Sequence, residues 1–350
     1  MRVLADLNLE ELKNLMQESD EKSFHALQIY KNVQSGKSIS EMTDISKALR
    51  EKLLNDFCDT PCEVIETKKS KDGTEKYLIK LHDGNVIESV FMSYKYGNTQ
   101  CISTQVGCRM GCAFCASGIG GLVRNMTSGE ILSEVAVVNR LHGGTLDKRS
   151  VTNIVLMGSG EPLDNYDNVV RFLKNVSAKE GLNISQRNIS LSTCGLVPQM
   201  LRLADEGVSV NLTVSLHNAF DEGRKQLMPI AKKYKISEIL DACSHYFDKT
   251  GRRYIFEYSL VKGKNDGEKD AEQLIKILKG RPCHVNLIRL NEVKEKHLLS
   301  TSDKSAYAFA KLLNDGGISA TVRRQLGNDI DGACGQLRRK YINGKEEDSH

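Results

Sequence analysis

Apolar positions recur at helical spacing over the first 57 residues. They predict three helices: the first starts after Asn8, a residue type that favours helix N-termini, the second ends near Gly36, and the third covers 45–57. The pattern then changes to short runs rich in β-branched and aromatic residues, over 63–67, 76–82 and 86–92. Asp-Gly pairs separate these runs, as they do in β-hairpins. We therefore expect an accessory domain over 1–95, in which helices precede a small β-meander.

Beyond residue 100, short apolar strand patterns alternate with longer helical patterns. The predicted strands cover 101–105, 152–157, 188–193, 210–216, 254–261, 284–290 and 319–323. The predicted helices include 128–141, 167–176, 238–247, 268–278 and 304–313. Repeated β–α units of this length imply an α/β domain with a parallel sheet and right-handed crossovers. Six or seven units fall short of a closed eight-stranded barrel, so an incomplete barrel and an open sheet both fit. We expect this second domain to cover 96–341, followed by a solvated tail over 342–350.

Composition narrows the class of protein. The 350 residues include 49 basic and 45 acidic ones, a net charge of +4, and 40% are hydrophobic. This balance excludes a disordered chain. A pI of 8.4 argues against a nucleic-acid binder that works by bulk charge, for which a pI above ~9 is usual. No apolar run reaches the ~18–20 residues of a membrane span, and the first residues lack a signal-peptide core. We expect a cytoplasmic protein without a membrane partner.

Ten cysteines are too few for a disulfide scaffold of this length, and a reducing cytosol keeps thiols free. Three of them, Cys108, Cys112 and Cys115, form a C-x3-C-x2-C pattern, with glycines at 107 and 111 that ease bending of the loop. A structural zinc ion normally takes a fourth Cys or His at a familiar offset, and none stands nearby. Iron–sulfur clusters usually have four cysteine ligands, so three would leave one iron open for a substrate or cofactor.

This spacing, with Phe114 before the third cysteine, resembles the radical S-adenosylmethionine (SAM) superfamily. The resemblance implies a partial (β/α)6-type barrel, a [4Fe–4S] cluster on the three cysteines, and SAM on the open iron. The C-x3-C pair Cys58 and Cys62 has no third partner, so we interpret it as structural. The thiols that fall in or beside regular elements are expected to be small buried hydrophobes: Cys194, Cys243 and Cys283.

Polar residues follow four of the predicted strands. They are the segment 158–162 with Gly160 and Glu161, then Ser192, the run Ser215, Leu216 and His217, and finally Asn291. The carboxyl ends of strands are where β/α barrels build their reactive sites, so we expect these groups to converge. The superfamily resemblance implies that Gly160 and Glu161 bind the methionyl amine of SAM. It also implies SAM contacts from the other five residues.

Two further cysteines lie far apart in sequence and near the expected barrel mouth. Cys101 precedes the cluster motif, and Cys334 lies between Gly332 and Gly335 after the last predicted strand. Paired thiols near SAM can act as nucleophile and resolver. The run 329–337, with segments 49–53, 101–127, 215–229 and 285–291, closely resembles the RlmN/Cfr family of radical SAM RNA adenine methyltransferases. Gly332 departs from the usual alanine of that motif.

The family resemblance implies a two-stage reaction. Cys334 takes a methyl group from one SAM, and a radical made from a second SAM removes hydrogen from that methyl. The methylene carbon then adds to the adenine, and Cys101 releases the methylated RNA by forming a transient disulfide with Cys334. The resemblance implies that the Glu88 carboxylate removes the proton from the adenine carbon that is methylated. From the sequence pattern alone, Glu88 fits a solvent-facing strand carboxylate better.

The resemblance implies that the enzyme methylates C2 of an adenosine in 23S rRNA and C2 of the adenosine beside the tRNA anticodon. The resemblance also implies that 1–95 binds RNA, that an electron donor such as flavodoxin supplies electrons, and that the chain is a monomer. The basic residues expected to meet RNA are Arg323, Arg324, Arg338, Arg339 and Lys340, with Lys68, Lys69, Lys71 and Lys76 on the meander. Two alternatives stay open: a Cfr-like enzyme that methylates C8 and confers antibiotic resistance, and a non-catalytic, zinc-stabilised RNA-binding module.

Overall fold

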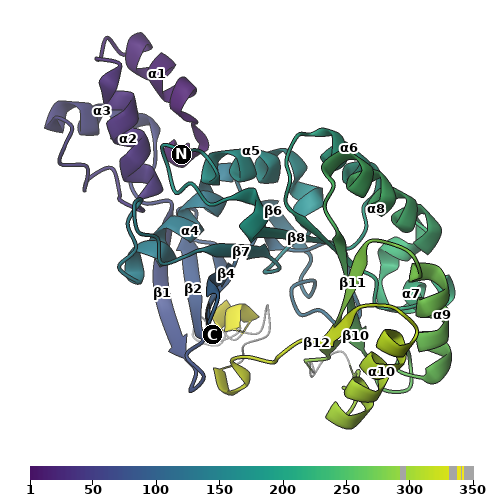
Figure 1. Ribbon diagram of the computed structural model, residues 1–350. Helices are drawn as coiled ribbons and strands as arrows, with labels where there is room; N and C mark the ends of the chain where they lie inside the picture. Colours follow the sequence, from purple (N-terminus) through teal and green to yellow (C-terminus); the bar gives the residue numbers. More distant parts are fainter. Residues whose placement is uncertain (292–296, 331–336, 340, 343–350) are drawn as a thin grey trace.

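The computed structural model describes residues 1–291, 297–330, 337–339 and 341–342. Three helices, α1 (Leu9–Glu18), α2 (Phe24–Gln34) and α3 (Lys47–Asp56), form a small bundle at the N-terminal end (Figure 1). The bundle has its own hydrophobic core around Leu12, Met16 and Ile29. Asn8 caps α1 through a hydrogen bond from the Glu11 backbone N–H, as its residue type predicts. The three predicted N-terminal helices are confirmed.

The meander follows as three antiparallel strands, β1 (Cys62–Lys69), β2 (Glu75–Leu81) and β3 (Val86–Tyr94). Strand β4 (Gly97–Cys101) pairs antiparallel with β3 on one side and parallel with β7 (Asn153–Leu156) on the other. The meander and the parallel strands therefore belong to one sheet. The domain division at residue 95 stays a prediction, because β3 and β4 pair across it.

The parallel part continues through β8 (Ile189–Thr193), β9 (Asn211–Ser215), β10 (Tyr254–Leu260), β11 (Cys283–Arg289) and β12 (Ala320–Val322). The ten strands run in the order β1-β2-β3-β4-β7-β8-β9-β10-β11-β12. In the described residues no pairing joins β1 to β12, so the sheet curves without closing. The prediction of a partial barrel is confirmed.

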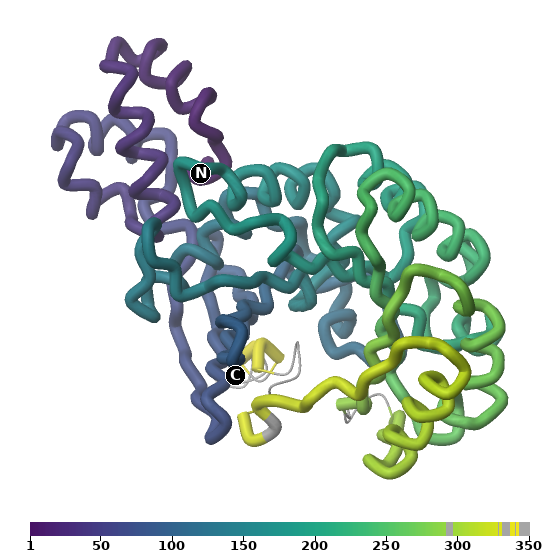
Figure 2. Tube along the Cα trace, viewed as in Figure 1, coloured from purple at the N-terminus to yellow at the C-terminus, as the bar shows by residue number. Residues whose placement is uncertain are grey.

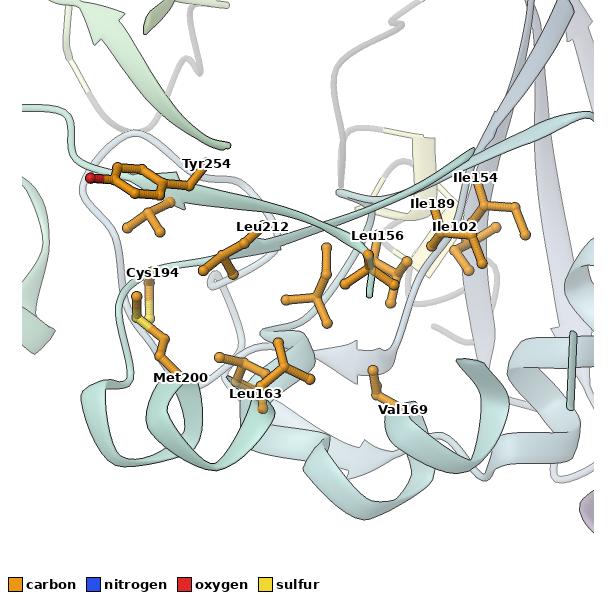
Figure 3. Packing of buried hydrophobic residues seen from close by; sticks show 14 of the residues in the cluster. Ile102, Ile154, Leu156, Leu163, Val169, Ile189, Cys194, Met200, Leu212 and Tyr254 are labelled. Carbon is orange, nitrogen blue, oxygen red and sulfur yellow. The ribbon is translucent and has the colours of Figure 1, made fainter. Parts of the chain in front are cut away.

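Helices cover the outer face of the curved sheet (Figure 1). They are α4 (Ser128–Leu141), α5 (Tyr166–Val176), α6 (Val197–Asp205), α7 (Asp221–Leu227), α8 (Ile236–Thr250), α9 (Glu268–Leu278) and α10 (Asp303–Asp315). The main hydrophobic core lies between the sheet and these helices. Ile154, Leu156 and Leu212 from the strands pack there near Leu163 and Val169 (Figure 3). None of the helices in the described ranges combines the length and apolar character of a bilayer span.

The structure corrects one strand and adds two helices. The strand expected over 101–105 lies over 97–101, because a two-residue turn joins Tyr94 to Gly97 and fixes the register with β3. Gly97 has φ +129°, and a Cβ there would overlap the Thr152 side chain. The sequence pattern did not predict α6 or α7. Short helices of nine and seven residues give too few turns for a clear apolar period.

The C-terminal segment leaves β12 and crosses to the meander (Figure 2). Asp72 Oδ2 in the β1–β2 turn accepts a hydrogen bond from the Gly327 N–H at 2.9 Å. Asp329 accepts bonds from the Ser70 hydroxyl and the Lys71 N–H. Farther along, Leu337 is buried against Leu78 and Val86. The predicted reactive cysteine, Cys334, and the glycines beside it lie outside the described residues.

Candidate cluster and cofactor site

The cluster motif occupies the loop between two short strands, β5 (Gln105–Gly107) and β6 (Leu122–Asn125). Gly107 opens the loop with φ +80°, and a Cβ at this position would overlap the Gly121 carbonyl oxygen. Only glycine fits such a left-handed, close approach of two backbone segments. The Ala113 N–H, in the middle of the motif, donates to the Leu227 carbonyl at 2.8 Å. The loop is thereby fixed to the C-terminal end of α7.

The three motif cysteines fit the ligand set of an iron–sulfur cluster. Burial raises the pKa of the Cys108 thiol to about 12, and it raises the pKa of the Cys112 thiol further. Each of these two thiols also feels the charge of Cys115 and of Glu161, so a cationic core is needed to hold the thiolates together. Among the described residues, no His, Cys, Asp and Glu side chains converge as a single metal ion requires. A four-iron cluster has no such requirement, because each thiolate binds a separate corner.

Glu161 lies within electrostatic reach of Cys108 and Cys112 in the cluster loop. Its side chain is buried, with Oε1 accepting the Leu163 N–H at 3.0 Å and Oε2 the Cys194 N–H at 2.7 Å. Burial raises its pKa, and the backbone donors oppose that rise. A carboxylate has about four acceptor positions, so this group can still receive an ammonium ion. Gly160, with φ +109°, leaves no room for a Cβ beside Gln105, and this close approach brings Glu161 to its place.

His217 connects the cluster loop to the carboxyl end of β9. Its ring makes an edge-to-face contact with Phe114 at 4.6 Å between centroids. Nδ1 accepts the Ser259 N–H at 2.9 Å, which leaves the hydrogen of the neutral ring on Nε2. The Asn265 amide donates to the His217 carbonyl at 2.7 Å and holds a backbone with φ +54°. Nε2 is therefore left as the hydrogen-bond donor of the neutral ring.

The buried imidazole predicts a pH dependence of stability. Burial, with the Arg224 charge in second place, lowers the pKa of His217 from 6.5 to about 3. The neutral ring stabilises the fold above pH 6.5, and this contribution falls as the pH drops from 6.5 toward 3. We expect the wild type to lose about 1.4 kcal/mol more unfolding free energy than His217→Asn between pH 7.5 and 5.5. Urea unfolding at the two pH values measures this difference, and equal losses would contradict it.

The other predicted cofactor residues lie at the same rim. Ser192 and Ser215 are half-buried at the ends of β8 and β9. Leu216 is fully buried, and its N–H donates to the Glu257 carbonyl on β10 at 2.9 Å. Asn291 is exposed just after β11, where its Oδ1 accepts from Gln325 at 3.4 Å. The carboxyl ends of β8, β9 and β11 thus carry the predicted residues.

Arg224 on α7 is a component of this rim that the sequence analysis missed. Its guanidinium is fully buried and donates to the carbonyls of Cys194, Ser215 and Leu216. These carbonyls end β8 and β9, so the side chain joins the two strands that carry predicted SAM contacts. The one available signal was its place seven residues after His217, inside the motif 215–229.

Comparisons with known proteins decide the family. The sequence model of the Radical SAM superfamily matches residues 102–276, and that of the ribosomal RNA large subunit methyltransferase N-terminal domain matches 3–58. A protein of Clostridium perfringens named "probable dual-specificity RNA methyltransferase RlmN" is 54% identical over 348 residues, 99% of each chain. A protein of the same name from Clostridium botulinum is 53% identical over 351 residues, again 99% of each chain. The chain belongs to the RlmN family of radical SAM enzymes.

A solved radical SAM methyltransferase from Sphaerobacter thermophilus is similar in structure, with a TM-score of 0.91 and 40% identity over 96% of this chain and 99% of that one. Membership of the RlmN family brings a [4Fe–4S] cluster and SAM as cofactors. The predictions of family, fold class and cofactors are thus confirmed. The individual residue assignments in the site stay predictions.

The structure places two predicted RlmN-family residues on adjacent strands. Cys101 ends β4, is buried, and lies opposite Val90 on β3. Glu88, two residues before Val90 on β3, is also buried. Its Oε2 lies 3.2 Å from Lys76 Nζ. Its Oε1 accepts the Arg338 N–H at 2.6 Å. The interpretation of Glu88 as a solvent-facing carboxylate is therefore wrong, because the C-terminal segment covers it.

Two of the predicted RNA contacts are also corrected. Lys76 is fully buried and paired with Glu88, so it cannot reach a phosphate from the meander surface. The Arg338 guanidinium is half-buried and donates to the Val86 carbonyl at 2.8 Å. Arg338 holds the C-terminal segment against β3, whereas Lys76 joins β2 to Glu88 on β3. Lys340 lies outside the described residues.

Proposed function

We propose that this enzyme methylates C2 of an adenosine in 23S rRNA and of the adenosine beside the tRNA anticodon. The observation that carries the proposal is the pairing of β3 with β4, which places a buried carboxylate, Glu88, near a buried thiol, Cys101, under the C-terminal segment. Aromatic C2 is no nucleophile, so methylation there needs a base for the ring proton and a thiol to release the product. We assign the methyl-carrying role to Cys334, because its motif resembles that of the family.

The chain's own residues have distinct tasks in this scheme. Cys108, Cys112 and Cys115 hold the cluster, which when bound supplies one-electron cleavage of SAM. Glu161 receives the methionyl ammonium group, and His217 Nε2 donates to an acceptor of the same molecule. Glu88 takes the ring proton on a carboxylate oxygen, and its Oε2 lies 3.2 Å from Lys76 Nζ. Cys101 attacks the Cys334 sulfur and frees the RNA. We place the enzyme in the cytoplasm, with a flavodoxin-type electron donor.

Nucleoside analysis tests the proposed function. The reconstituted enzyme, SAM and a reductant are incubated separately with a 23S rRNA fragment and with tRNA. Digestion followed by chromatography and mass spectrometry separates 2-methyladenosine from 8-methyladenosine. We expect the C2 product from both RNAs. An 8-methyladenosine product would show the Cfr-type reaction instead, and a colourless zinc protein without product would show a binding module.

A stacked tyrosine pair offers an RNA contact that the sequence analysis did not predict. Tyr94 and Tyr96, at the β3–β4 turn, lie nearly parallel with ring centroids 5.0 Å apart. Tyr94 packs in one cluster with Cys101 and Leu326, whereas Tyr96 is 75% exposed. The charges of Arg323 and Arg324 act on the Tyr94 hydroxyl and oppose the rise in pKa that burial causes. An exposed ring beside arginines can stack on an unpaired base while the cations meet its phosphates.

Tyr96→Ala is expected to raise the KM for RNA about tenfold and to leave kcat at saturating RNA unchanged. The reason is the loss of one base–aromatic stack, worth ~1–3 kcal/mol. Tyr96→Phe keeps the stack and should behave as the wild type. Tyr307→Ala removes an exposed tyrosine from α10 and serves as control. The chain contains no tryptophan, so Tyr96→Trp adds a single fluorophore that RNA should quench. An unquenched tryptophan and unchanged KM would contradict the contact.

A further inference from the structure

Arg224 is a buried cation with an incomplete set of partners. The residue is 0% exposed. Nη2 donates to the carbonyls of Cys194 at 2.7 Å and Ser215 at 3.2 Å, and Nε donates to Leu216 at 3.2 Å. In the described part of the chain, Nη1 has no hydrogen-bond partner although it is fully buried. A buried donor without an acceptor is costly, and the cost is greater for a charged group.

No carboxylate of the described residues forms an ion pair with this guanidinium. The nearest acidic group on its own helix, Asp221, accepts the Ile236 N–H at 2.8 Å instead. Burial lowers the pKa of Arg224, and the sulfur atoms of Cys194 and Cys112 oppose this more strongly than Asp221 does. Two of the groups that face Arg224 are therefore the thiols of Cys194 and Cys112, and Cys112 belongs to the cluster motif.

Backbone contacts also place Arg224 close to the cluster loop. Arg224 lies one turn before Leu227, whose carbonyl accepts the Ala113 N–H from the middle of the cluster loop. The Arg224 carbonyl accepts the Met228 N–H at 2.7 Å, and a Cβ added at Gly111 would lie 3.7 Å from the ring of the next residue, Pro229. The cluster loop thus packs on the helix end that carries the guanidinium, on both sides of Cys112.

We propose that Arg224 is the counter-charge of the loaded cluster and that its Nη1 donates a hydrogen bond to the sulfur atoms at the Cys112 corner. Three thiolates outnumber the positive charge of the core in both of its working oxidation states, so the loaded site is an anion. Reduction adds a further negative charge. A fixed cation and an N–H···S bond stabilise the reduced state more than the oxidised state, and both are known determinants of cluster potential. Arg224 is therefore a positioning and tuning residue that makes the cluster easier to reduce.

This inference rests on the cluster of the family and is independent of which carbon of which RNA is methylated. The counter-charge role differs from a second role for Arg224, binding of the SAM carboxylate, which is the other anion expected at this rim. A counter-charge for the cluster acts before SAM is present. A carboxylate ligand changes SAM affinity and has no effect on the cluster alone.

Redox titration of the reconstituted enzyme without SAM tests the proposal, with the reduced cluster measured by electron paramagnetic resonance. For Arg224→Met we expect the ratio of reduced to oxidised cluster at a fixed potential to fall at least tenfold, a shift of about 59 mV or more to lower potential. Arg224→Lys keeps the charge and should lie closer to the wild type. Arg149→Met is the matched control, because Arg149 also donates to a carbonyl and has a buried, unpartnered Nε, but lies at the opposite end of β7. It should titrate as the wild type.

An unchanged potential in Arg224→Met, or a shift seen only when SAM is added, would overturn the proposal. Iron and sulfide content after reconstitution decides the case in which Arg224→Met binds no cluster. A counter-charge predicts that Arg224→Lys retains the cluster that Arg224→Met loses. A purely structural tie between β8 and β9 predicts that both variants lose it equally, since lysine cannot span three carbonyls, and that result would also refute the inference.

Discussion

Cys101→Ala is expected to leave the enzyme covalently attached to its RNA. Without the resolving thiol, the carbon–carbon bond between the methylene on Cys334 and the adenine forms, but the bond from that carbon to the Cys334 sulfur cannot be broken by disulfide formation. Turnover should end within one cycle, and steady-state product should fall by about a hundredfold or more. Incubation with labelled RNA and SAM, followed by denaturing electrophoresis, should show a protein band that carries the label.

Cys243→Ala is the control for this experiment, because Cys243 is a fully buried thiol on α8 away from the cluster loop. This variant should turn over normally and carry no label. A Cys101→Ala enzyme that releases methylated RNA, or that attaches none, would remove Cys101 from the resolving role. Residual methylation by Cys334→Ala would in the same way remove Cys334 from the mechanism.

Cys112→Ala is expected to abolish cluster binding and all SAM cleavage. Two remaining thiolates cannot hold the cluster in a loop whose shape depends on the whole motif. Iron and sulfide analysis after anaerobic reconstitution should give values near zero, and activity should fall by about four orders of magnitude or more. The absorbance of the bound cluster should disappear as well.

A second buried cysteine close to Cys112 provides the control for Cys112→Ala. Cys194 is a buried thiol within electrostatic reach of Cys112, but it lies at the end of β8, outside the motif. Cys194→Ala should keep its iron and most of its activity. Cluster retention by Cys112→Ala, or cluster loss by Cys194→Ala, would show that the ligand set has been assigned incorrectly.

Local signals in the sequence predict much of the fold. The bounds of α4 and α9 agree with the predicted ranges because their ends carry clear signals, such as the capping box between Thr127 and Glu130. The polar residues expected at strand ends also lie at the carboxyl ends of β8, β9 and β11 in the structure, and their roles stay predictions. These features depend on neighbours in sequence, which a single chain displays directly.

Long-range pairing explains what the sequence could not predict. Arg224 and Lys76 lie among charged residues and look like surface cations, yet both are fully buried. Their partners are the ends of β8 and β9 for Arg224, and Glu88 for Lys76. The burial of Glu88 likewise depends on a segment some 250 residues away. Stacking of Tyr94 on Tyr96 needs the turn that only the β3–β4 register creates.

The C-terminal segment is attached to the meander, the part of the chain expected to bind RNA. On both sides of 331–336 the described residues attach to the meander, through Asp329 at the β1–β2 turn and Leu337 beside β2 and β3. The described residues next to 331–336 thus contact the accessory strands, at Asp329 and at Leu337. A substrate that moves the β1–β2 turn would therefore also move Asp329, through its hydrogen bonds to Ser70 and Lys71.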